Sequence, residues 1–248
     1  MNAEMFIAEA RRLLSPIVGK SGGVLYSSFS TLVPGRFYII GLNPGGADLT
    51  GETIGHSLDN LRRYNHNAYL DEDWSSGTRH YLPGGHPLQR HIVSLMQQLG
   101  EDTRHVCASN LIFTRSPNQY AADFPESGHI CWPVHQLLLN IVKPDVIIAF
   151  GNGAISPYAF LAAKHLETQG TWPAEYMHAA EYRKWQCKAF LGSFDIHDIL
   201  VIGLPHLSRY TIEGRPAVLN WIKEMIRRHN EGFEGTGDPL AARRSPQP

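Results

Sequence analysis

Apolar residues recur along the chain in two patterns, one typical of helices and one typical of buried strands. Over five segments, spacings of three and four residues place apolar side chains on one face, and each segment predicts a helix. Four other segments hold short apolar runs, which predict strands buried on both faces. The predicted helices span residues 2–14, 88–99, 131–142, 158–166 and 216–228, and the predicted strands span residues 36–42, 105–112, 145–151 and 199–204.

The order of these segments indicates the fold class. Strands alternate with helices, and strands that are apolar on both faces need helices on both sides of their sheet. We therefore predict an α/β fold with three layers, α/β/α, around a central, mainly parallel sheet of four strands. One domain is expected over residues 1–229, with a polar insertion at 46–85 near the site. Residues 230–248, rich in Gly, Glu, Pro and Arg, predict a flexible C-terminal tail.

Composition and charge narrow the classes of function. The chain has 248 residues, of which 43% are hydrophobic and 18% charged, as in one globular domain with a sizeable core. A formal net charge of −1 argues against a protein that coats nucleic acid, so DNA would have to bind to a local positive patch. No apolar run approaches the roughly 20 residues that cross a bilayer, and no secretion signal is recognisable. We expect a cytoplasmic monomer without a membrane partner.

The cysteines and histidines do not form a recognisable metal motif. Cys107, Cys131 and Cys187 are odd in number and widely spaced, which favours buried thiols over disulfides. Five histidines in the segment 56–91 match no familiar zinc spacing and have no cysteine nearby. We expect neither a metal nor another cofactor.

The residues that follow the predicted strands carry the candidate chemistry. In an open α/β sheet, ligands bind outside the carboxyl ends of the strands. Amides, a histidine and an Arg–Ser pair therefore converge on one edge of the predicted sheet. The segments at these ends are 41–46, 109–118, 151–153 and 205–210.

This set of side chains favours hydrolysis of an N-glycosidic bond. An amide can position a water or bind a base edge, although it is a poor general base. A glycosidic bond that breaks with oxocarbenium character needs little help from the nucleophile. The leaving base needs stabilisation of the charge on its carbonyl oxygen, which a histidine N–H can supply. A nucleoside hydrolase would instead bring carboxylates to these strand ends to bind calcium.

Several of these segments, in this order, resemble motifs of the uracil-DNA glycosylase superfamily. Gly41-Leu42-Asn43-Pro44-Gly45 resembles the first motif in its Gly-x-Asn-Pro-Gly form, found in the mismatch-specific and single-strand-selective branches. Leu204-Pro205-His206-Leu207-Ser208-Arg209 resembles the second motif, usually His-Pro-Ser. Between them, 109–111 stands where the family places a base-reading asparagine, and 131–151 resembles the helix that leads into the third strand. The resemblance covers about residues 36–225.

The resemblance implies a role for each matching residue. Asn43 would position the attacking water, and His206 would stabilise the leaving base. The flipped base would contact Gly41, Leu42, Gly45 and Asn110 and would stack on Tyr81. The DNA backbone would contact Ser208, Arg209 and, by our expectation, Arg115. These roles predict a monofunctional DNA glycosylase that leaves an abasic site, because no lysine lies inside the motifs to form a Schiff base.

The sequence also departs from the family pattern. Leu207 replaces the usual proline, and about 35 residues separate Gly46 from Tyr81. The branch with an iron–sulfur cluster uses four cysteines, and the three cysteines here stand elsewhere. Gly45 replaces a bulky aromatic residue that blocks C5 substituents in the uracil-selective branch. The base removed could therefore be uracil, or a heavily modified cytosine (hydroxymethylated or glucosylated) in phage DNA, in which case the protein would act in antiviral defence.

Each motif also has an ordinary structural interpretation. Segment 43–45 could be a turn, Asn110 could be a cap, and His206 is one of 13 histidines. A non-catalytic nucleotide- or DNA-binding module on the same scaffold is therefore a second class of function. Residues 182–188 mix cations with aromatics, as in a DNA contact or a charged strand edge. Tyr81 competes with Tyr64, Tyr69 and Trp74 for the stacking role, and Asp48 indicates a helix cap.

Overall fold

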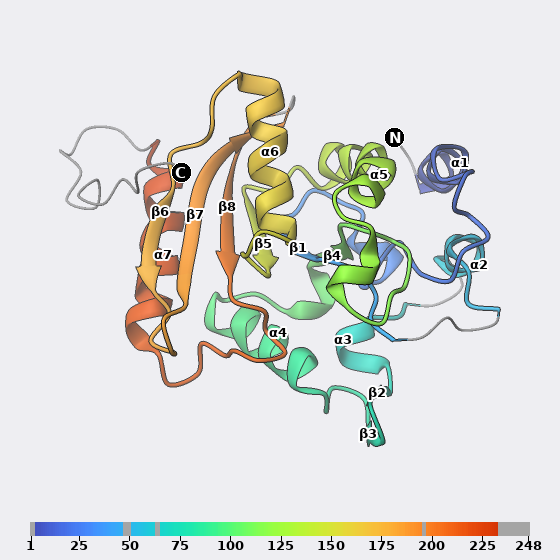
Figure 1. Cartoon of the computed structure of the whole chain (residues 1–248), viewed down its shortest axis with the longest axis horizontal. Helices are drawn as coiled ribbons and strands as arrows, with labels where there is room; N and C mark the ends of the chain where they lie inside the picture. The colour runs from blue at the N-terminus through green and yellow to red at the C-terminus, as the bar shows by residue number, and fades with distance from the viewer. Residues whose placement is uncertain (1–2, 47–50, 63–64, 195–196, 233–248) are drawn as a thin grey trace.

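A six-stranded sheet forms the centre of the protein. The structure, a computed structural model, describes residues 3–46, 51–62, 65–194 and 197–232. The strands of the sheet are β1 (Phe37–Gly41), β4 (Cys107–Asn110), β5 (Val146–Phe150), β6 (Tyr176–Ala179), β7 (Gln186–Ser193) and β8 (Asp198–Leu204). Their spatial order is β4-β1-β5-β8-β7-β6 (Figure 1). Strands β4, β1, β5 and β8 are parallel to one another, β7 is antiparallel to β8, and β6 is antiparallel to β7. The prediction of an α/β fold with a mainly parallel sheet is confirmed.

The predicted number of four strands is wrong, because β6 and β7 extend the sheet. The four predicted strands form its parallel part, where burial is continuous along each strand. In β7, buried residues alternate with more exposed ones, and β6 has no fully buried residue. These strands therefore lack the apolar run that marked the other four. Residues 182–188 hold the turn between β6 and β7 and the first residues of β7.

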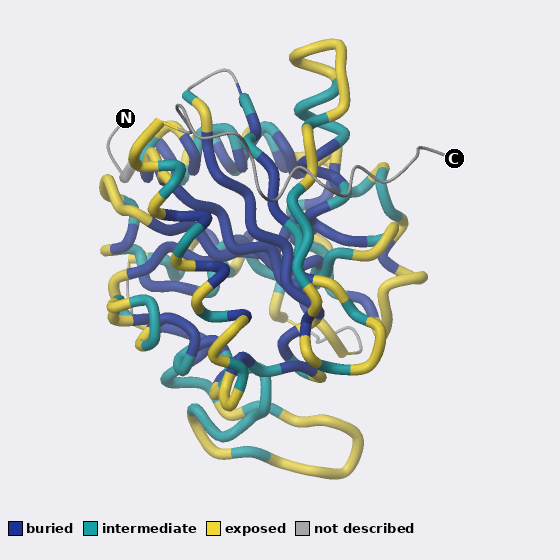
Figure 2. The backbone as a smooth tube through the Cα atoms, turned by 90° about the vertical axis from the view of Figure 1, so that its left-hand side faces the viewer, coloured by how far each residue is buried: buried dark blue, intermediate teal, exposed yellow. Residues whose placement is uncertain are grey.

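Helices cover both faces of the sheet and enclose one apolar core on each. Along β1, Tyr38 and Ile40 point into the first core, and Phe37 and Ile39 point into the second. Figure 2 shows the strands as a buried band through the middle of the molecule. The first core is covered by α1 (Ala3–Leu13), α5 (Glu126–Val142) and α6 (Pro157–Gln169), and the second by α4 (Pro87–Gln98) and α7 (Pro216–Asn230).

The ends of several helices differ from the predicted ends. Helix α4 begins with a capping box, in which His86 and Gln89 satisfy backbone N–H groups reciprocally. Helix α5 begins five residues before the predicted start and keeps Pro133 inside it. Helix α7 includes Asn230, the first residue of the predicted tail, whereas 233–248 lie outside the described residues. Within the described ranges, no helix has the length and apolar character needed to span a bilayer.

The insertion at 46–85 has secondary structure of its own and is tied to α4. The buried Gln89 side chain donates to the carbonyl oxygens of Ala68 and Glu72, both at 2.8 Å. The hairpin of β2 (Trp74–Ser76) and β3 (Arg79–Tyr81) projects beyond α4 at the lower end of the molecule (Figure 1). The described part of the insertion contains α2 (Ile54–Asn60), α3 (Ala68–Asp71), β2 (Trp74–Ser76) and β3 (Arg79–Tyr81). The three 3-10 turns of the described chain are η1 (Phe29–Thr31), η2 (Thr103–His105) and η3 (Gln119–Ala122).

The strand order brings the predicted site segments to one edge. From β1 the chain goes to β4 on one side and then crosses to β5 on the other, so the order reverses at β1. Ligands of open α/β sheets bind at such a reversal, outside the carboxyl ends of the strands. The register pairs Gly41 with Asn110, and Phe150 with Leu204. The segments that follow these four residues therefore lie at a common edge.

Candidate functional site

The side chain of Asn43 has a fixed orientation. Its Nδ2 donates to the Pro44 carbonyl oxygen at 2.7 Å and to Ser116 Oγ at 2.8 Å. A carbonyl oxygen can only accept, so the atom beside it must be the NH₂ group. Both N–H bonds are thus used, and Oδ1 accepts no hydrogen bond from any described residue. This half-buried oxygen is left to accept from a water.

Gly41 lets two buried side chains meet above the end of β1. A Cβ atom at this position would collide with Asn110 Oδ1 and with the ring of Phe150. Asn110 is 4% exposed and Phe150 is 3% exposed. The absence of a side chain at Gly41 therefore sets how closely the ends of β4 and β5 approach each other.

Asn110 also lies beside the N-terminal segment of the chain. The pKa of the Tyr26 hydroxyl is raised mainly by burial and then by Glu72, and the nearby Asn110 side chain acts against this rise. The segment of Tyr26 is fixed beside β4 by the Leu25–Ser109 bridge. An amide and a phenol therefore stand together at the end of β4, an arrangement that can read the polar edge of a base.

His206 is held in one tautomer. The backbone N–H of Ser208 donates to His206 Nδ1 at 3.2 Å, and Ser208 Oγ lies 2.8 Å from the same nitrogen. Because Nδ1 accepts, the single proton of a neutral ring is on Nε2. The structure thus places Ser208, predicted as a DNA contact, against the imidazole that it orients.

The surroundings of His206 keep its ring neutral. His206 is an exposed residue, yet the protein atoms that surround its ring reduce the solvation of the charged form. This loss of solvation, followed by the charges of Arg209 and His86, lowers the pKa of His206 to about 4. The Phe150 ring stands edge-on to the imidazole with centroids 5.5 Å apart. At pH 7 the site therefore offers an N–H donor without a positive charge.

Leu207 explains the departure in the second motif. Its side chain is fully buried in the core beside α7. Its carbonyl oxygen lies 2.6 Å from Nδ1 of His91 in α4 and can only accept. The loop that carries His206 is therefore anchored to the core and to α4 without the usual proline.

A row of aromatic rings connects the insertion with the site. Trp74 and Tyr81 lie 5.3 Å and 5.0 Å from the ring of His86, which stands near His206. Trp74 also lies 6.0 Å from Tyr69. The structure thus places Tyr81 beside His86, and within the described residues its ring does not contact that of Tyr26 at the Asn110 end of the site. The stacking role of Tyr81 stays a prediction.

Arg115 supports the first motif instead of pointing freely into solvent. Its Nη1 donates to the Gly45 carbonyl oxygen at 2.6 Å, and its Nη2 pairs with Glu52 at 3.3 Å. Its charge still acts on the Tyr26 hydroxyl. Arg115 also lines a cavity of about 610 Å³. The other lining residues are Gly19, Lys20, Ser21, Gly51, Thr53, Thr114, Ala121, Ala122, Asp123 and Ser127.

Gly45 leaves space open at the end of the first motif. The residue is exposed, and no atom of the described residues lies within 4 Å of the position that a Cβ would take. The neighbouring Leu42 is buried in the first core and supports the loop from below. The described part of the loop therefore has the open space beside Gly45 that the sequence predicted.

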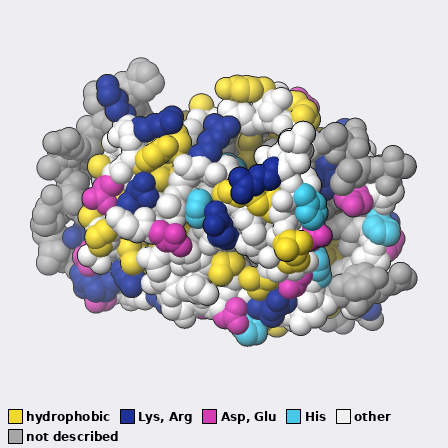
Figure 3. All heavy atoms as spheres, turned by 90° about the horizontal axis from the view of Figure 1, so that it is seen from below, with side chains coloured by type: hydrophobic (Ala, Val, Ile, Leu, Met, Phe, Trp, Pro, Cys, Tyr) yellow, Lys and Arg dark blue, Asp and Glu magenta, His cyan; other side chains and the backbone are white. Residues whose placement is uncertain are grey.

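Positive side chains surround the site. Arg209 is exposed next to His206, Arg90 acts on His86, and Arg79 lies over the Tyr81 ring at 4.8 Å. None of the three has an acidic partner in the described part of the chain. Figure 3 shows Lys and Arg side chains across the middle of this face, seen from below. A local positive surface thus exists despite the net charge of −1.

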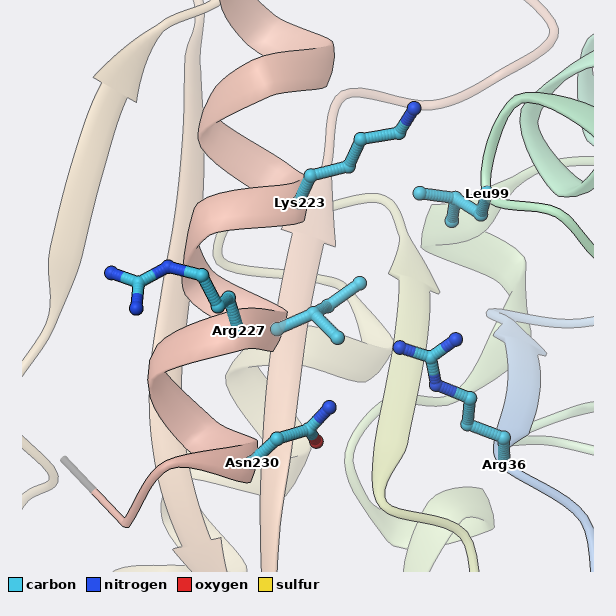
Figure 4. Close-up of a pocket in the computed structure, with 6 residues that line it drawn as sticks. Arg36, Leu99, Lys223, Arg227 and Asn230 are labelled. Carbon is cyan, nitrogen blue, oxygen red and sulfur yellow. The ribbon is translucent and has the colours of Figure 1, made fainter.

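A second cavity, of about 290 Å³, lies at the opposite edge of the sheet (Figure 4). Its lining includes Arg36, directly before β1, so it lies at the amino ends of the strands. Lys223, Arg227 and Asn230 of α7 line it as well, with Leu99 and Ile226. It is far from the amide and histidine groups and offers no acid, histidine or hydroxyl group for catalysis.

A buried histidine in α5 supports the chain at the end of β4. His135 in α5 lies 2.9 Å from the Tyr38 hydroxyl through Nδ1 and 3.0 Å from the Leu111 carbonyl oxygen through Nε2. Since the carbonyl can only accept, Nε2 carries the proton and the Tyr38 hydroxyl donates to Nδ1. Burial lowers the pKa of His135 to about 4. This neutral bridge fixes the backbone directly after Asn110.

Several residues at the site were not predicted. Tyr26 lies in a segment without periodicity, Phe150 has the sequence signal of an ordinary strand residue, and Ser116 and His86 match no motif. Only the rule that ligands bind after strand ends indicated the neighbourhood of Ser116. Two residues considered from the sequence, Asp48 and Tyr64, lie outside the described residues.

The described residues contain no group of three His, Cys, Asp or Glu side chains placed to hold a metal ion. Cys107, Cys131 and Cys187 are buried on three different elements, and burial raises the pKa of each thiol.

Neither the protein-family models nor the curated proteins compared with this chain give a match. The family resemblance thus depends on the sequence motifs alone.

Proposed function

We propose that this protein is a monofunctional DNA glycosylase of the uracil-DNA glycosylase type. It hydrolyses the N-glycosidic bond of a flipped pyrimidine and leaves an abasic site. One observation carries the proposal: at the same sheet edge, Asn43 has an acceptor and His206 has a donor that no described residue occupies. These are the two groups that hydrolysis without a strong base requires.

The reaction divides between these two residues. Asn43 Oδ1 accepts a hydrogen bond from the attacking water and directs its lone pair toward the sugar carbon. The Nε2–H of His206 donates to the carbonyl oxygen on which negative charge grows as the base leaves. A neutral ring suits this role, because its N–H stabilises the leaving base, whereas a positively charged ring would also attract the DNA phosphates. The sugar carries the positive charge in the transition state, so the water needs little activation.

The side chains around this pair fit a flipped base. Asn110 and Tyr26 supply polar groups for its edge, and the Phe150 ring supplies an apolar wall next to His206. The buried Tyr69 hydroxyl, close to Tyr26, has no hydrogen-bond partner in the described residues. A buried hydroxyl without a partner costs about 1–3 kcal/mol, which a polar ligand or a water would offset. Arg209, Arg90 and Arg79 supply positive charge for the DNA backbone.

Base release from oligonucleotides tests the proposal. Duplex and single-stranded oligonucleotides with one uracil, hypoxanthine, mismatched thymine or modified cytosine would be incubated with the protein and treated with alkali. Cleavage at the marked base only after alkali supports hydrolysis without strand incision. Cleavage without alkali would contradict the monofunctional assignment. If no substrate is cleaved, a non-catalytic DNA-binding module becomes the better hypothesis.

Matched variants connect the activity with the site. Asn43→Ala and His206→Ala should retain DNA binding and lose base release by about 100-fold or more, as when one stabilising donor is removed from an active site. Asn140→Ala and His105→Ala change exposed residues of the same types away from the carboxyl edge and should keep the wild-type rate. Full activity in both site variants would refute the assignment.

A second candidate substrate is cytosine with a bulky polar group at C5. The open space at Gly45 favours it, because no atom of the described residues lies within 4 Å of the position that a Cβ would take there. The nearby cavity of about 610 Å³, beyond Arg115, has hydroxyl, cationic and carboxylate groups that suit a hydroxymethyl or sugar adduct. Removal of such bases from phage DNA would be a defence function.

A bulky side chain at Gly45 separates the two substrate classes. Gly45→Tyr has room to fold, and its ring should block C5 adducts while uracil still enters. If wild type releases modified cytosine and Gly45→Tyr does not, the open position selects the substrate. If wild type releases uracil and no modified cytosine, the defence reading fails.

A further inference from the structure

The most exposed large aromatic side chain of the described residues stands on a turn that follows the first site segments. Tyr120 lies in η3, between β4 and α5, and is 79% exposed. Within the described chain, its ring contacts no other ring and its hydroxyl makes no hydrogen bond. A ring this exposed buries little apolar surface, so it adds little to the stability of the fold. It is available to contact a ligand.

The turn that carries Tyr120 is fixed, although the ring itself is exposed. The Asn118 side chain caps the turn, because its Oδ1 accepts from the backbone N–H groups of Tyr120 at 3.0 Å and Ala121 at 3.1 Å. At the other end of the turn, Ala122 is buried in the first core. The ring is therefore presented from an ordered backbone, which reduces the entropy that binding would cost.

Hydrogen bonds connect this turn to the residue proposed to position the water. Asn43 donates to Ser116 Oγ, which donates in turn to the Asn118 carbonyl oxygen at 2.8 Å. Tyr120 follows Ser116 by four residues, a span of at most about 14 Å. Stacked nucleotides of one strand are about 3.4 Å apart. When the target sugar lies at Asn43, the neighbouring nucleotides of its strand therefore pass within reach of the ring.

The charges near the turn favour stacking over an ionic contact. The residues that follow Tyr120 line the cavity of about 610 Å³, together with Lys20 and Arg115. Asp123 lies in the same lining and Arg115 pairs with Glu52, so two acids offset the two cations. A balanced surface gives a phosphate little net attraction. Affinity for a nucleotide at this place has to come mainly from the ring.

We propose that Tyr120 stacks on the base of a nucleotide next to the one whose base is excised. The inference rests on the proposed function and extends it, because it adds a second base-binding position outside the site of the flipped base. Every base has a face that an aromatic ring can cover, so the contact tolerates any flanking sequence. The neighbour has to be unpaired, since a base inside a duplex already stacks on both sides. The contact therefore strengthens binding to single-stranded DNA.

A double-mutant cycle between protein and DNA tests the contact. The probe is a short single-stranded oligonucleotide whose target deoxyuridine carries fluorine at C2′, which resists hydrolysis. Two further probes lack the base of the 5′ neighbour or of the 3′ neighbour. Wild type should bind one of them about tenfold or more weakly than the intact probe, as expected for the loss of one stacked base. Tyr120→Ala should show the same loss on the intact probe and no further loss when that base is removed.

Matched variants and salt separate stacking from other effects. Tyr120→Phe keeps the ring and should bind the intact probe within about twofold of wild type. Trp172→Ala removes another exposed aromatic side chain, in the loop between α6 and β6 at the upper end of the molecule (Figure 1), and should bind like wild type. The loss in Tyr120→Ala should be equal at low and high salt, because stacking releases no counterions.

Two results would overturn the inference. One is equal affinity of wild type and Tyr120→Ala for the intact probe. The other is independent losses, in which Tyr120→Ala loses affinity again by the wild-type factor when the neighbouring base is removed. Failure of the proposed function is a different result, since wild type would then release no base from any oligonucleotide in the alkali assay.

Discussion

Gly41→Ala is the substitution that most directly tests the geometry of the site. The added methyl would overlap Asn110 Oδ1 and the Phe150 ring, both of which are buried and cannot turn into solvent. Alanine is compatible with the strand backbone at Gly41, so the effect is steric only. Overpacking of this kind costs about 1–3 kcal/mol of unfolding free energy. A displacement of the reading amide on the order of 1 Å would lower the rate of base release by about 100-fold.

Gly45→Ala is the matched control. It lies in the same motif, four residues after Gly41, and its new methyl would have no atom of the described residues within 4 Å. Urea unfolding and single-turnover base release on uracil-containing DNA would be measured for both variants. We expect Gly45→Ala to match wild type in both measurements. Gly41→Ala should have a lower free energy of unfolding and a lower rate of base release. If Gly41→Ala unfolds and reacts like wild type, then Asn110 and Phe150 do not meet above β1 as described.

Three further predictions concern the support of the site. Because burial lowers the pKa of His135 from 6.5 to about 4, the unfolded chain takes up a proton in this range and the folded protein does not. The free energy of unfolding is therefore unaffected by this histidine above pH 6.5, and it decreases as the pH falls from 6.5 to about 4. The loss is about 3 kcal/mol, and urea unfolding of His135→Asn should lack this part of the pH dependence. Ser116→Ala removes a partner of Asn43 and should slow base release about tenfold at unchanged DNA binding, whereas an unchanged rate would show that the amide needs no such support. Leu207→Ala should lower the free energy of unfolding by about 2–5 kcal/mol, since the side chain is fully buried; a loss under about 1 kcal/mol would contradict its place in the core.

The parallel part of the sheet could be predicted from the sequence because of how it is buried. Residues such as Phe37 and Tyr38 are enclosed on opposite faces, so no polar residue interrupts the strand. The antiparallel strands were missed for the opposite reason. In β7, the buried Cys187 and Ala189 are separated by the less buried Lys188, and this short alternation resembles loop sequence as much as strand.

Site residues could be predicted where a polar side chain stands at or just after the end of a strand. They could not be predicted where contacts between distant segments bring a residue to the site. Asn43, Asn110 and His206 stand directly after strand ends, and the fold places them at one edge. Tyr26 reaches Asn110 only because a distant segment pairs with β4, which local sequence does not encode. The burial of Leu207 depends likewise on the packing of α4 and α7, so the motif alone cannot indicate it.

Because Asn43 donates to Ser116, we expect positions 43 and 116 to vary together among relatives of this chain. An aspartate at 43 would place a carboxylate oxygen against the Pro44 carbonyl, where two acceptors repel each other. The loop therefore accepts a carboxylate only if its backbone changes, and Ser116 then loses the N–H that it receives. Among relatives of this chain, asparagine at 43 should accompany a hydroxyl residue at 116, and aspartate at 43 should accompany a different residue there. An alignment in which the two positions vary independently would show that the amide is chosen for another reason.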